Sequence, residues 1–487
     1  MSVPPRPGRC LLGAAAALVG LAVSLPARGQ AASEAEKLRV DPTITLEGKS
    51  FPDIEDSPTR FAEPRRLFYV SADAKAEGDG SETQPWKDLQ AALCRLEPGD
   101  RLVLLPGIYA GAVRIGASCK PGRADAPIQV FGEEAFFHAA EGAHALTVSR
   151  PFWHFYHMQM VLDRPGAKGF AVLGEDAHDI VFDRGHVYEG PGVAILVGAT
   201  SARVSISNSH VHQSGGIRIQ VGARDVELHH NKIHHNLDAA LRIVPGKDGE
   251  IARNLTLVRN KFHNDTGPAL DLSRCRGVRV EANKIYNYRP GAGSRGEAVV
   301  LGPGAEDIVI TGSYFAEATV GVRVNGAAKV LLLRNYFENM LSEKSTALEV
   351  VAGRGIDVLG NTIDRYAVGI RVQGRPPGVE GVRFANNLIL DTLELAFDIE
   401  DSAAVADVGH NGFGGPAGKL RGRISGKTIA IGSGDPALPP GSRAAAGVRL
   451  SGRDLARVEG LVVRDAGKPF DGVTFAGAAP DIGVAEK

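Results

Sequence analysis

Between about residue 179 and residue 400, the chain repeats one short pattern of apolar and polar positions. Each copy has an apolar strand, an Asn, one apolar residue, a polar residue, a turn of small residues and a second apolar strand. Clear copies lie at 225–243, 254–272, 277–301 and 329–350. Apolar and polar residues alternate within each piece, which predicts β-strands, about three per copy.

A single copy is too thin to bury its own apolar face. Copies of this kind must therefore stack, and self-similarity at a period of 20 to 50 residues is typical of a solenoid. The copies begin 22 to 30 residues apart. This unequal spacing predicts loops of different lengths projecting from a regular coil.

The stretch 68–111 precedes the repeat and has its own signature. It carries a first strand, an acidic Gly loop, the pair Pro85 and Trp86, an expected capping helix near 86–96, and PGD and PGIY motifs. With the repeat and the ending at 477–487, it resembles the pectate-lyase-like superfamily, without matching one enzyme family. The resemblance covers roughly residues 67 to 485 and implies an all-β fold, a right-handed parallel β-helix with an N-terminal capping helix. Such folds carry many unrelated activities.

The pattern divides the chain into five regions. Residues 1–31 have Arg6 and Arg9 before an apolar run at 10–25 and small residues near the end, as a signal peptide requires. The others are an extended arm at 32–66, an N-terminal cap with the first coils at 67–135, the β-helix at 136–415 and a C-terminal cap at 416–487. No segment is apolar and long enough to span a membrane. We therefore expect a periplasmic or secreted protein.

The charge balance bears on which partners the protein binds, and the cysteines bear on disulfide and metal sites. Without residues 1–31 the chain has 52 basic and 56 acidic side chains, and this near-neutral balance argues against nucleic acid as a partner. We expect a monomer. Cys94 and Cys119 could pair in an oxidising compartment, which would leave Cys275 as a buried thiol. No cysteine spacing resembles a zinc site.

One Asn recurs at the same position of most copies. We interpret it as a buried ladder, because an Asn tolerates a left-handed backbone and its amide can bond the next rung. Ser replaces it twice. The ladder comprises Ser209, Asn231, Asn260, Asn283, Ser313, Asn335, Asn361 and Asn387.

Shortly after that Asn comes a row of side chains suited to chemistry. Alternation turns them outward. The row reads Tyr188, His212, His234, His263 and Tyr286.

The next strand supplies a second outward row, and in the superfamily the substrate groove lies along this strand and the turn before it. The resemblance therefore implies one patch of His and Arg side chains, bordered by His235, Asp238, Tyr288 and Arg289 on the turns. Insertions at 244–254 and 287–297 would form its walls. The second row reads Ile195, Arg218, Arg242, Asp271, Val300, Arg323, Glu349, Arg371 and Asp398.

This patch suits a lyase that cleaves a uronate-containing, acidic polysaccharide by β-elimination. Arg218 and Arg242 would clamp the carboxylate, His234 or His263 would remove the adjacent proton, and Tyr286 or Tyr288 would protonate the leaving oxygen. His212, His235, Asp238, Asp271 and Arg289 would contact the polymer.

Other interpretations remain open. A C5 epimerase of a polyuronate needs the same groups, and a non-catalytic polysaccharide-binding or structural β-helix needs only the surface. Outward His, Arg and Asp can also be a solvated face, with Arg242 and Asp271 paired across rungs. For Arg323, Glu349, Arg371 and Asp398 we favour this structural role. Calcium stays open as a cofactor through Asp265, Asp271 or Glu297.

Overall fold

The computed structural model describes residues 56–59, 61–246, 249–291, 293–339, 343–373 and 378–400, together with short strands outside these ranges. The predicted signal peptide 1–31 lies outside the described residues, as do most of the arm 32–66 and of the C-terminal cap 416–487. Within the described part, no helix is long and apolar enough to cross a membrane.

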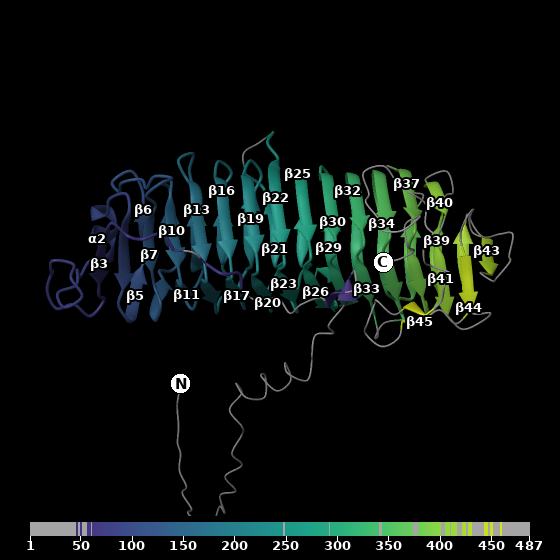
Figure 1. Cartoon of the computed structure of the whole chain (residues 1–487), viewed down its shortest axis with the longest axis horizontal. Coiled ribbons are helices and arrows are strands. Elements are labelled where there is room, and N and C mark those ends of the chain that lie inside the picture. Colours follow the sequence, from purple (N-terminus) through teal and green to yellow (C-terminus); the bar gives the residue numbers. More distant parts are fainter. Residues whose placement is uncertain are drawn as a thin grey trace, which may run out of the picture. The chain divides into compact units, whose positions relative to one another are not determined.

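The chain forms a parallel β-solenoid in which each rung contributes three strands (Figure 1). In one rung these are β13 (His178–Asp183), β14 (His186–Tyr188) and β15 (Ile195–Val197). They pair in parallel with β16 (Ala202–Ser207), β17 (His210–His212) and β18 (Ile217–Gln220) of the next rung. Stacked copies with about three strands each are confirmed.

Three strand columns run along the coil, and we call them sheets 1, 2 and 3 in chain order within a rung. Sheet 1 contains β13 and β16, sheet 2 contains β14 and β17, and sheet 3 contains β15 and β18. The other strands of sheet 1 are β3 (Arg66–Val70), β4 (Asp100–Leu104), β7 (Ile128–Phe131), β10 (Trp153–Tyr156), β19 (Arg224–His229), β22 (Ala252–Val258), β25 (Cys275–Glu281), β30 (Glu306–Thr311), β37 (Val379–Ala385) and β40 (Val405–Gly409).

Sheet 2 is a separate sheet of 14 strands. Its other members are β5 (Gly107–Gly111), β8 (Ala135–Ala139), β11 (Gln159–Val161), β20 (Lys232–His234), β23 (Lys261–His263), β26 (Lys284–Tyr288), β31 (Tyr314–Ala318), β33 (Tyr336–Glu338), β35 (Thr362–Asp364), β38 (Leu388–Leu390), β41 (Gly412–Gly415) and β44 (Arg443–Ala446).

Sheet 3 completes each rung. Its other members are β6 (Val113–Ile115), β9 (His144–Val148), β12 (Lys168–Val172), β21 (Leu241–Val244), β24 (Leu270–Leu272), β29 (Glu297–Leu301), β36 (Val368–Val372), β39 (Leu395–Ile399) and β42 (Arg421–Ile424). Two long strands, β32 (Val320–Leu333) and β34 (Thr346–Leu359), continue from sheet 3 into sheet 1.

Short antiparallel pairs also occur among the described strands, and one of them involves β42 of sheet 3. They are β1 (Thr45–Leu46) with β2 (Lys49–Ser50), β27 (Pro290–Gly291) with β28 (Ser294–Arg295), β42 with β43 (Lys427–Ala430), and β45 (Arg449–Leu450) with β46 (Val458–Glu459).

The core runs inside the coil because alternate residues of each strand point inward. In sheet 2 the inward residues of successive rungs include Val187, Val211, Ile233 and Phe262, all without solvent exposure. Further along, Phe315 and Phe337 stack with ring centroids 4.6 Å apart. Each rung thus covers the apolar face of its neighbour, which is the reason that the copies had to stack.

The Asn ladder is confirmed as a chain of buried hydrogen bonds. The Asn260 carboxamide oxygen accepts from the backbone N–H of Asn231 at 3.0 Å, and its Nδ2 donates to Leu228 O at 2.8 Å and to Asn283 Oδ1 at 3.1 Å. The same pattern continues to Asn411.

The expected left-handed backbone of the ladder Asn residues is wrong. The left-handed residue is the one before them, such as His230 (φ 58°), Arg259 (φ 51°) and Ala282 (φ 52°). The turn is therefore made one position earlier. The Asn is retained for its amide, which satisfies the backbone groups that the turn leaves unpaired.

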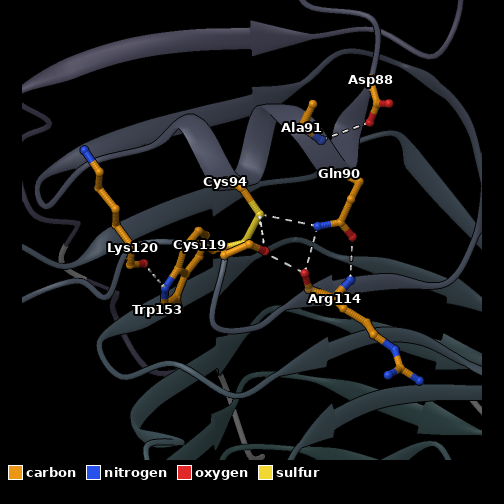
Figure 2. Close-up of a disulfide and its surroundings, with 9 residues drawn as sticks. Asp88, Gln90, Ala91, Cys94, Arg114, Cys119, Lys120 and Trp153 are labelled. Atoms are coloured by element: carbon orange, nitrogen blue, oxygen red, sulfur yellow. Dashed lines mark hydrogen bonds between the residues drawn. A yellow bond between two sulfur atoms is a disulfide. The ribbon is translucent and has the colours of Figure 1, made fainter.

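A short helix, α2 (Leu89–Arg95), covers the first rungs as expected. Asp88 caps it by accepting from the N–H of Ala91 at 2.9 Å, and Leu89, Ala92 and Leu93 are its buried residues. Figure 2 shows the disulfide between Cys94 of α2 and Cys119 in the turn after β6. This pairing and the buried free thiol of Cys275 are both confirmed.

The described end of the arm lies on sheet 1. The backbone N–H of Ser57 donates to Asn208 Oδ1 at 2.7 Å, and Thr59 Oγ1 donates to Asp183 Oδ2 at 2.7 Å. Ser57 and Thr59 therefore contact sheet 1, and the extended arm over 32–66 stays a prediction.

The Asn ladder generates a stability prediction with a matched neighbour. Asn260→Ala should lower the free energy of unfolding by about 3 kcal/mol, because Asn231 N–H and Leu228 O would be buried without partners. Arg259→Gly should stay within about 1 kcal/mol of the unmodified protein, since glycine adopts the left-handed conformation without strain. Urea unfolding measures the free energy of unfolding of both variants. Equal losses of stability would contradict the assignment of the stabilising hydrogen bonds to the Asn260 amide.

The disulfide generates a second prediction. Its cysteines are 25 residues apart. Closing a loop of that length lowers the entropy of the unfolded chain and so raises the free energy of unfolding by about 3 kcal/mol. The double variant Cys94→Ala, Cys119→Ala should therefore unfold at lower urea concentration. Adding a thiol reductant should shift the unmodified protein toward the variant and leave the variant unchanged. An unmodified protein insensitive to the reductant would count against this contribution.

Candidate functional site

The outer face of sheet 2 carries two parallel columns of polar side chains between β14 and β26. The predicted row is one of them: Tyr188, His212, His234, His263 and Tyr286 are direct neighbours on five successive rungs. The second column lies two residues earlier on each strand. It consists of His186, His210, Lys232, Lys261 and Lys284.

Sequence reasoning missed His186 and His210. The signal was present, because alternation places both histidines of the segment His210-Val211-His212 on the same side of the strand. We call the outer surface formed by both columns the imidazole face.

The rings of the predicted row stack along the coil. His212 and His234 have centroids 5.2 Å apart, His234 and His263 4.5 Å, and His263 and Tyr286 4.7 Å, with interplanar angles of 7°, 13° and 11°. Tyr188 closes the other end at 5.5 Å from His212. The parallel register holds these rings above one another.

Ring nitrogens meet directly on the imidazole face. Nε2 of His186 lies 2.8 Å from Nε2 of His212, and Nε2 of His210 lies 2.5 Å from Nε2 of His234. Nδ1 of His234 lies 2.6 Å from Nδ1 of His235, which follows it in the turn. In each contact one ring must donate and the other accept, or both must face a shared cation.

Burial and mutual repulsion keep these imidazoles neutral. Burial lowers the pKa of His186 to about 4 and that of His210 to about 3, with smaller contributions from neighbouring imidazoles. The pKa of His234 is likewise far below its usual value, because the ring is buried and four other imidazoles surround it.

His263 differs from the expectation of an outward, accessible side chain. It points away from the coil interior but is only 3% exposed, and burial lowers its pKa to about 2. Within the described part of the chain, neither of its ring nitrogens has a hydrogen-bond partner. A buried imidazole in this state lacks compensation for its lost hydration.

The second predicted row lies on sheet 3 and is in register from Arg218 to Asp398. Its first member was wrong. Ile195 is fully buried, and Leu196 is the residue paired with Arg218. The outward position of β15 is therefore one residue later than predicted.

The two arginines of the expected clamp are already bound by the protein. Asp238 Oδ2 accepts from Arg218 Nη2 at 2.8 Å and from Arg242 Nη1 at 2.7 Å. Arg242 Nε also donates to Asp271 at 2.7 Å, which is the cross-rung pairing of the alternative, structural interpretation. The Arg218 side chain is additionally tied to the carbonyl groups of Ile217 and Ala239, and the residue is only 7% exposed. This arrangement does not offer Arg218 to a substrate carboxylate.

The later part of the row forms cross-rung ion pairs. Arg323 lies 3.2 Å from Glu349, and Arg371 lies 3.3 Å from Asp398. Arg295, in the hairpin β27–β28, reaches Glu349 at 2.9 Å. This pairing supports the expected structural role.

Tyr288 does not border a surface site, so that expectation is wrong. It is 1% exposed, and its hydroxyl donates to Asp265 Oδ2 at 2.6 Å. Asp265 also accepts from Asn236, and burial raises its pKa to about 7. Asp265, on the turn between β23 and β24, and Tyr288, at the end of β26, are therefore both held inside. Arg289 remains exposed, 3.8 Å from Glu317.

The three carboxylates considered for calcium do not converge. Asp265 is engaged inside, Asp271 binds Arg242, and Glu297 accepts from Ser294 and from the N–H of Arg295. Among the described residues, the groups of three or more possible metal ligands are both made of histidines. They are His186, His210 and His212, and His234, His235 and His263, with ligand atoms within 4.8 Å of one another in each group.

Surface hollows also occur elsewhere. One of about 310 Å³ lies beside the arm and is lined by residues such as Thr59, Tyr156 and Asp183. Another, of about 710 Å³, is lined by residues that include Gly326 of β32 and Gly353 of β34. None of the predicted site residues lines either hollow.

Comparison with known proteins establishes the class. Residues 166–296, which include the imidazole face, match a family model described as right handed beta helix region. The chain is thus a right-handed parallel β-helix protein, as the repeat and the resemblance predicted.

The first of three solved structures supports that fold. The A-module of the Azotobacter vinelandii mannuronan C-5 epimerase AlgE6 aligns with a TM-score of 0.51 at 17% identity, over 70% of this chain and 99% of that chain. The A-module of the epimerase AlgE4 from the same organism aligns with a TM-score of 0.42 at 15% identity, over 70% and 100%. Pectate lyase Pel9A aligns with a TM-score of 0.37 at 16% identity, over 87% and 97%. No curated protein sequence matches the chain.

Further along sheet 2, Asp364 allows a prediction about pH. It is 6% exposed and lies 2.9 Å from Arg365 Nε, and burial raises its pKa to about 6 despite that partner. Because the folded pKa exceeds the unfolded value, Asp364 favours folding below pH 4, and this contribution is lost as the pH rises through 6. Asp364→Asn removes the titration. The difference in unfolding free energy between the unmodified protein and the variant should fall by about 3 kcal/mol between pH 4 and pH 7. Urea unfolding at both pH values measures it, and a constant difference would contradict the prediction.

Proposed function

We propose that the chain acts on a uronate-containing polysaccharide by β-elimination, with the polymer lying along the imidazole face. The observation that carries this proposal is the outward row from Tyr188 to Tyr286, held in register on five successive rungs. A linear polymer needs such an extended row rather than an enclosed pocket. The printed names of the similar structures, a mannuronan epimerase and a pectate lyase among them, are in keeping with an acidic polysaccharide.

The roles of individual residues differ from those expected from sequence. Arg218 and Arg242 are held by Asp238, so the positive charge facing a uronate carboxylate comes from Lys232 and Lys261 in the neighbouring column. His234 has both ring nitrogens in contact with other imidazoles. It therefore orients the row rather than removing a substrate proton.

Tyr286 is the proton-transfer group that we assign. It is half-buried, stacks on His263 and has the Lys261 ammonium 5.7 Å from its ring centroid. As a phenolate beside a bound uronate, the Tyr286 oxygen would remove the proton next to the carboxylate, and the phenol so formed would return that proton to the leaving oxygen as the glycosidic bond breaks. His212 and the exposed His235 would contact the polymer on the same face.

Export is part of the proposal. The apolar run at 10–25 has the composition of a signal peptide, and the Cys94–Cys119 disulfide suits an oxidising compartment. Both features are expected of a periplasmic or secreted enzyme that meets its polymer outside the cytoplasm.

The test is incubation of the protein with alginate, pectate and chondroitin while ultraviolet absorbance reports unsaturated sugar ends. Tyr286→Phe should lower kcat at least 100-fold, because a proton-transfer group contributes about 10²–10⁴-fold. Tyr69→Phe, a half-buried tyrosine of β3, is the matched control and should retain full activity.

Two other outcomes would redirect the assignment. Unchanged absorbance with an altered C5 composition in proton NMR of the recovered polymer would replace elimination by epimerisation. Binding of the polymer with neither change would leave a non-catalytic binding protein.

A further inference from the structure

The second histidine group of the imidazole face has the arrangement of a metal site. His234 ends β20, His235 follows it in the turn, and His263 ends β23 on the next rung. Their candidate ligand atoms lie within 4.8 Å of one another. Parallel pairing of His234 with His263 fixes two of the three rings on the rigid part of the coil.

The orientation of the rings brings one nitrogen of His234 and one nitrogen of His235 to the same point on the imidazole face. Nδ1 of His234 and Nδ1 of His235 face each other at 2.6 Å. The outer nitrogens have partners of their own: Nε2 of His234 contacts His210 Nε2 at 2.5 Å, and Nε2 of His235 lies 3.1 Å from the Asn264 amide. Metal-binding histidines are held in this way, with one nitrogen toward the ion and the other fixed by a neighbour.

His263 supplies the independent observation. Only 3% of His263 is exposed to solvent, and its ring stacks on His234. Neither ring nitrogen has a hydrogen-bond partner in the described part of the chain. Burying an imidazole without any partner is unfavourable. A cation between His263 and the two Nδ1 atoms would satisfy one of its nitrogens.

The other histidine group lacks this feature. His186 and His212 contact each other through Nε2, and His210 uses its Nε2 for His234. These contacts pair the rings across rungs. The group around His263 is therefore the better candidate.

We propose that His234, His235 and His263 bind one divalent transition-metal cation of the zinc class. Neutral imidazole nitrogen suits zinc, copper and nickel, whereas calcium takes oxygen ligands.

The geometry needs only small adjustments. Zinc bonds of about 2.0–2.1 Å to tetrahedral nitrogen ligands place those nitrogens about 3.4 Å apart. The Nδ1 atoms of His234 and His235 must separate from 2.6 Å, and the other pairs, at up to 4.8 Å, must close. Nearby Lys261 repels a cation, which should weaken the binding.

Three protein ligands leave a fourth tetrahedral position open, as in catalytic zinc sites. That this position receives a uronate carboxylate, next to Tyr286, rests on the proposed function. Binding of the cation does not depend on it.

The test uses the full-length, untagged protein after chelator treatment, titrated calorimetrically with Zn²⁺ in the absence of polysaccharide. One equivalent should bind. His235→Asn should weaken binding at least 10-fold, because it removes one ligand while asparagine tolerates the left-handed backbone at this position (φ 53°).

His157→Asn is the matched control. His157 also follows directly after a strand, β10, in a left-handed conformation (φ 57°), and it lies outside the histidine group. Its zinc affinity should equal that of the unmodified protein. As a second readout, Co²⁺ should give the visible absorption of a tetrahedral nitrogen site, and His235→Asn should lose it.

Absence of zinc binding, or equal binding by His235→Asn, would overturn the inference. The outcome is separate from that of the proposed function. A protein that binds zinc but leaves every polymer intact retains the metal site and loses the lyase assignment. A protein that cleaves a polymer without binding zinc does the reverse.

Discussion

Parallel, in-register pairing of successive rungs is the constraint on which the rest of this structure depends. It places each side chain directly above its counterpart on the neighbouring rung, at the strand spacing of about 4.8 Å. Equivalent residues of adjacent rungs, such as Asn231 and Asn260 or His234 and His263, are therefore in direct contact. Every repeated position becomes a column, and its chemistry is that of the column rather than of one residue.

Different columns satisfy this constraint in different ways. Carboxamides suit it well, because each can donate to one neighbour and accept from the other. Charged side chains of the arginine row are neutralised by carboxylates on an adjacent rung, as Arg371 is between Glu349 and Asp398. Others are neutralised by a carboxylate on a turn, as Arg218 and Arg242 are by Asp238. Burial, together with repulsion between neighbouring imidazoles, lowers the pKa values of the stacked histidines and favours their neutral form. Neutral, closely spaced imidazoles are in turn good ligands, so the potential for metal binding follows from the fold.

The turns decide which side chains of a column remain available. Asp238 and Asp265 both lie on turns between sheets 2 and 3. The first binds both Arg218 and Arg242, and the second draws Tyr288 into the interior. Consequently the arginine row of sheet 3 is largely satisfied by the protein itself, and the chemistry that we propose belongs to sheet 2.

Repeat period and alternation alone determined the stacked coil, the Asn ladder and the register from Tyr188 to Tyr286, because these depend only on positions within one repeated unit. Alternation also places His186 and His210 on the outer face of sheet 2, although they were not predicted as site residues. It could not reveal that Tyr288 turns inward, that Arg218 is occupied by Asp238, or that His263 is shielded from solvent. Those outcomes depend on how turns of unequal length fold over neighbouring rungs, and only the tertiary structure brings such segments together.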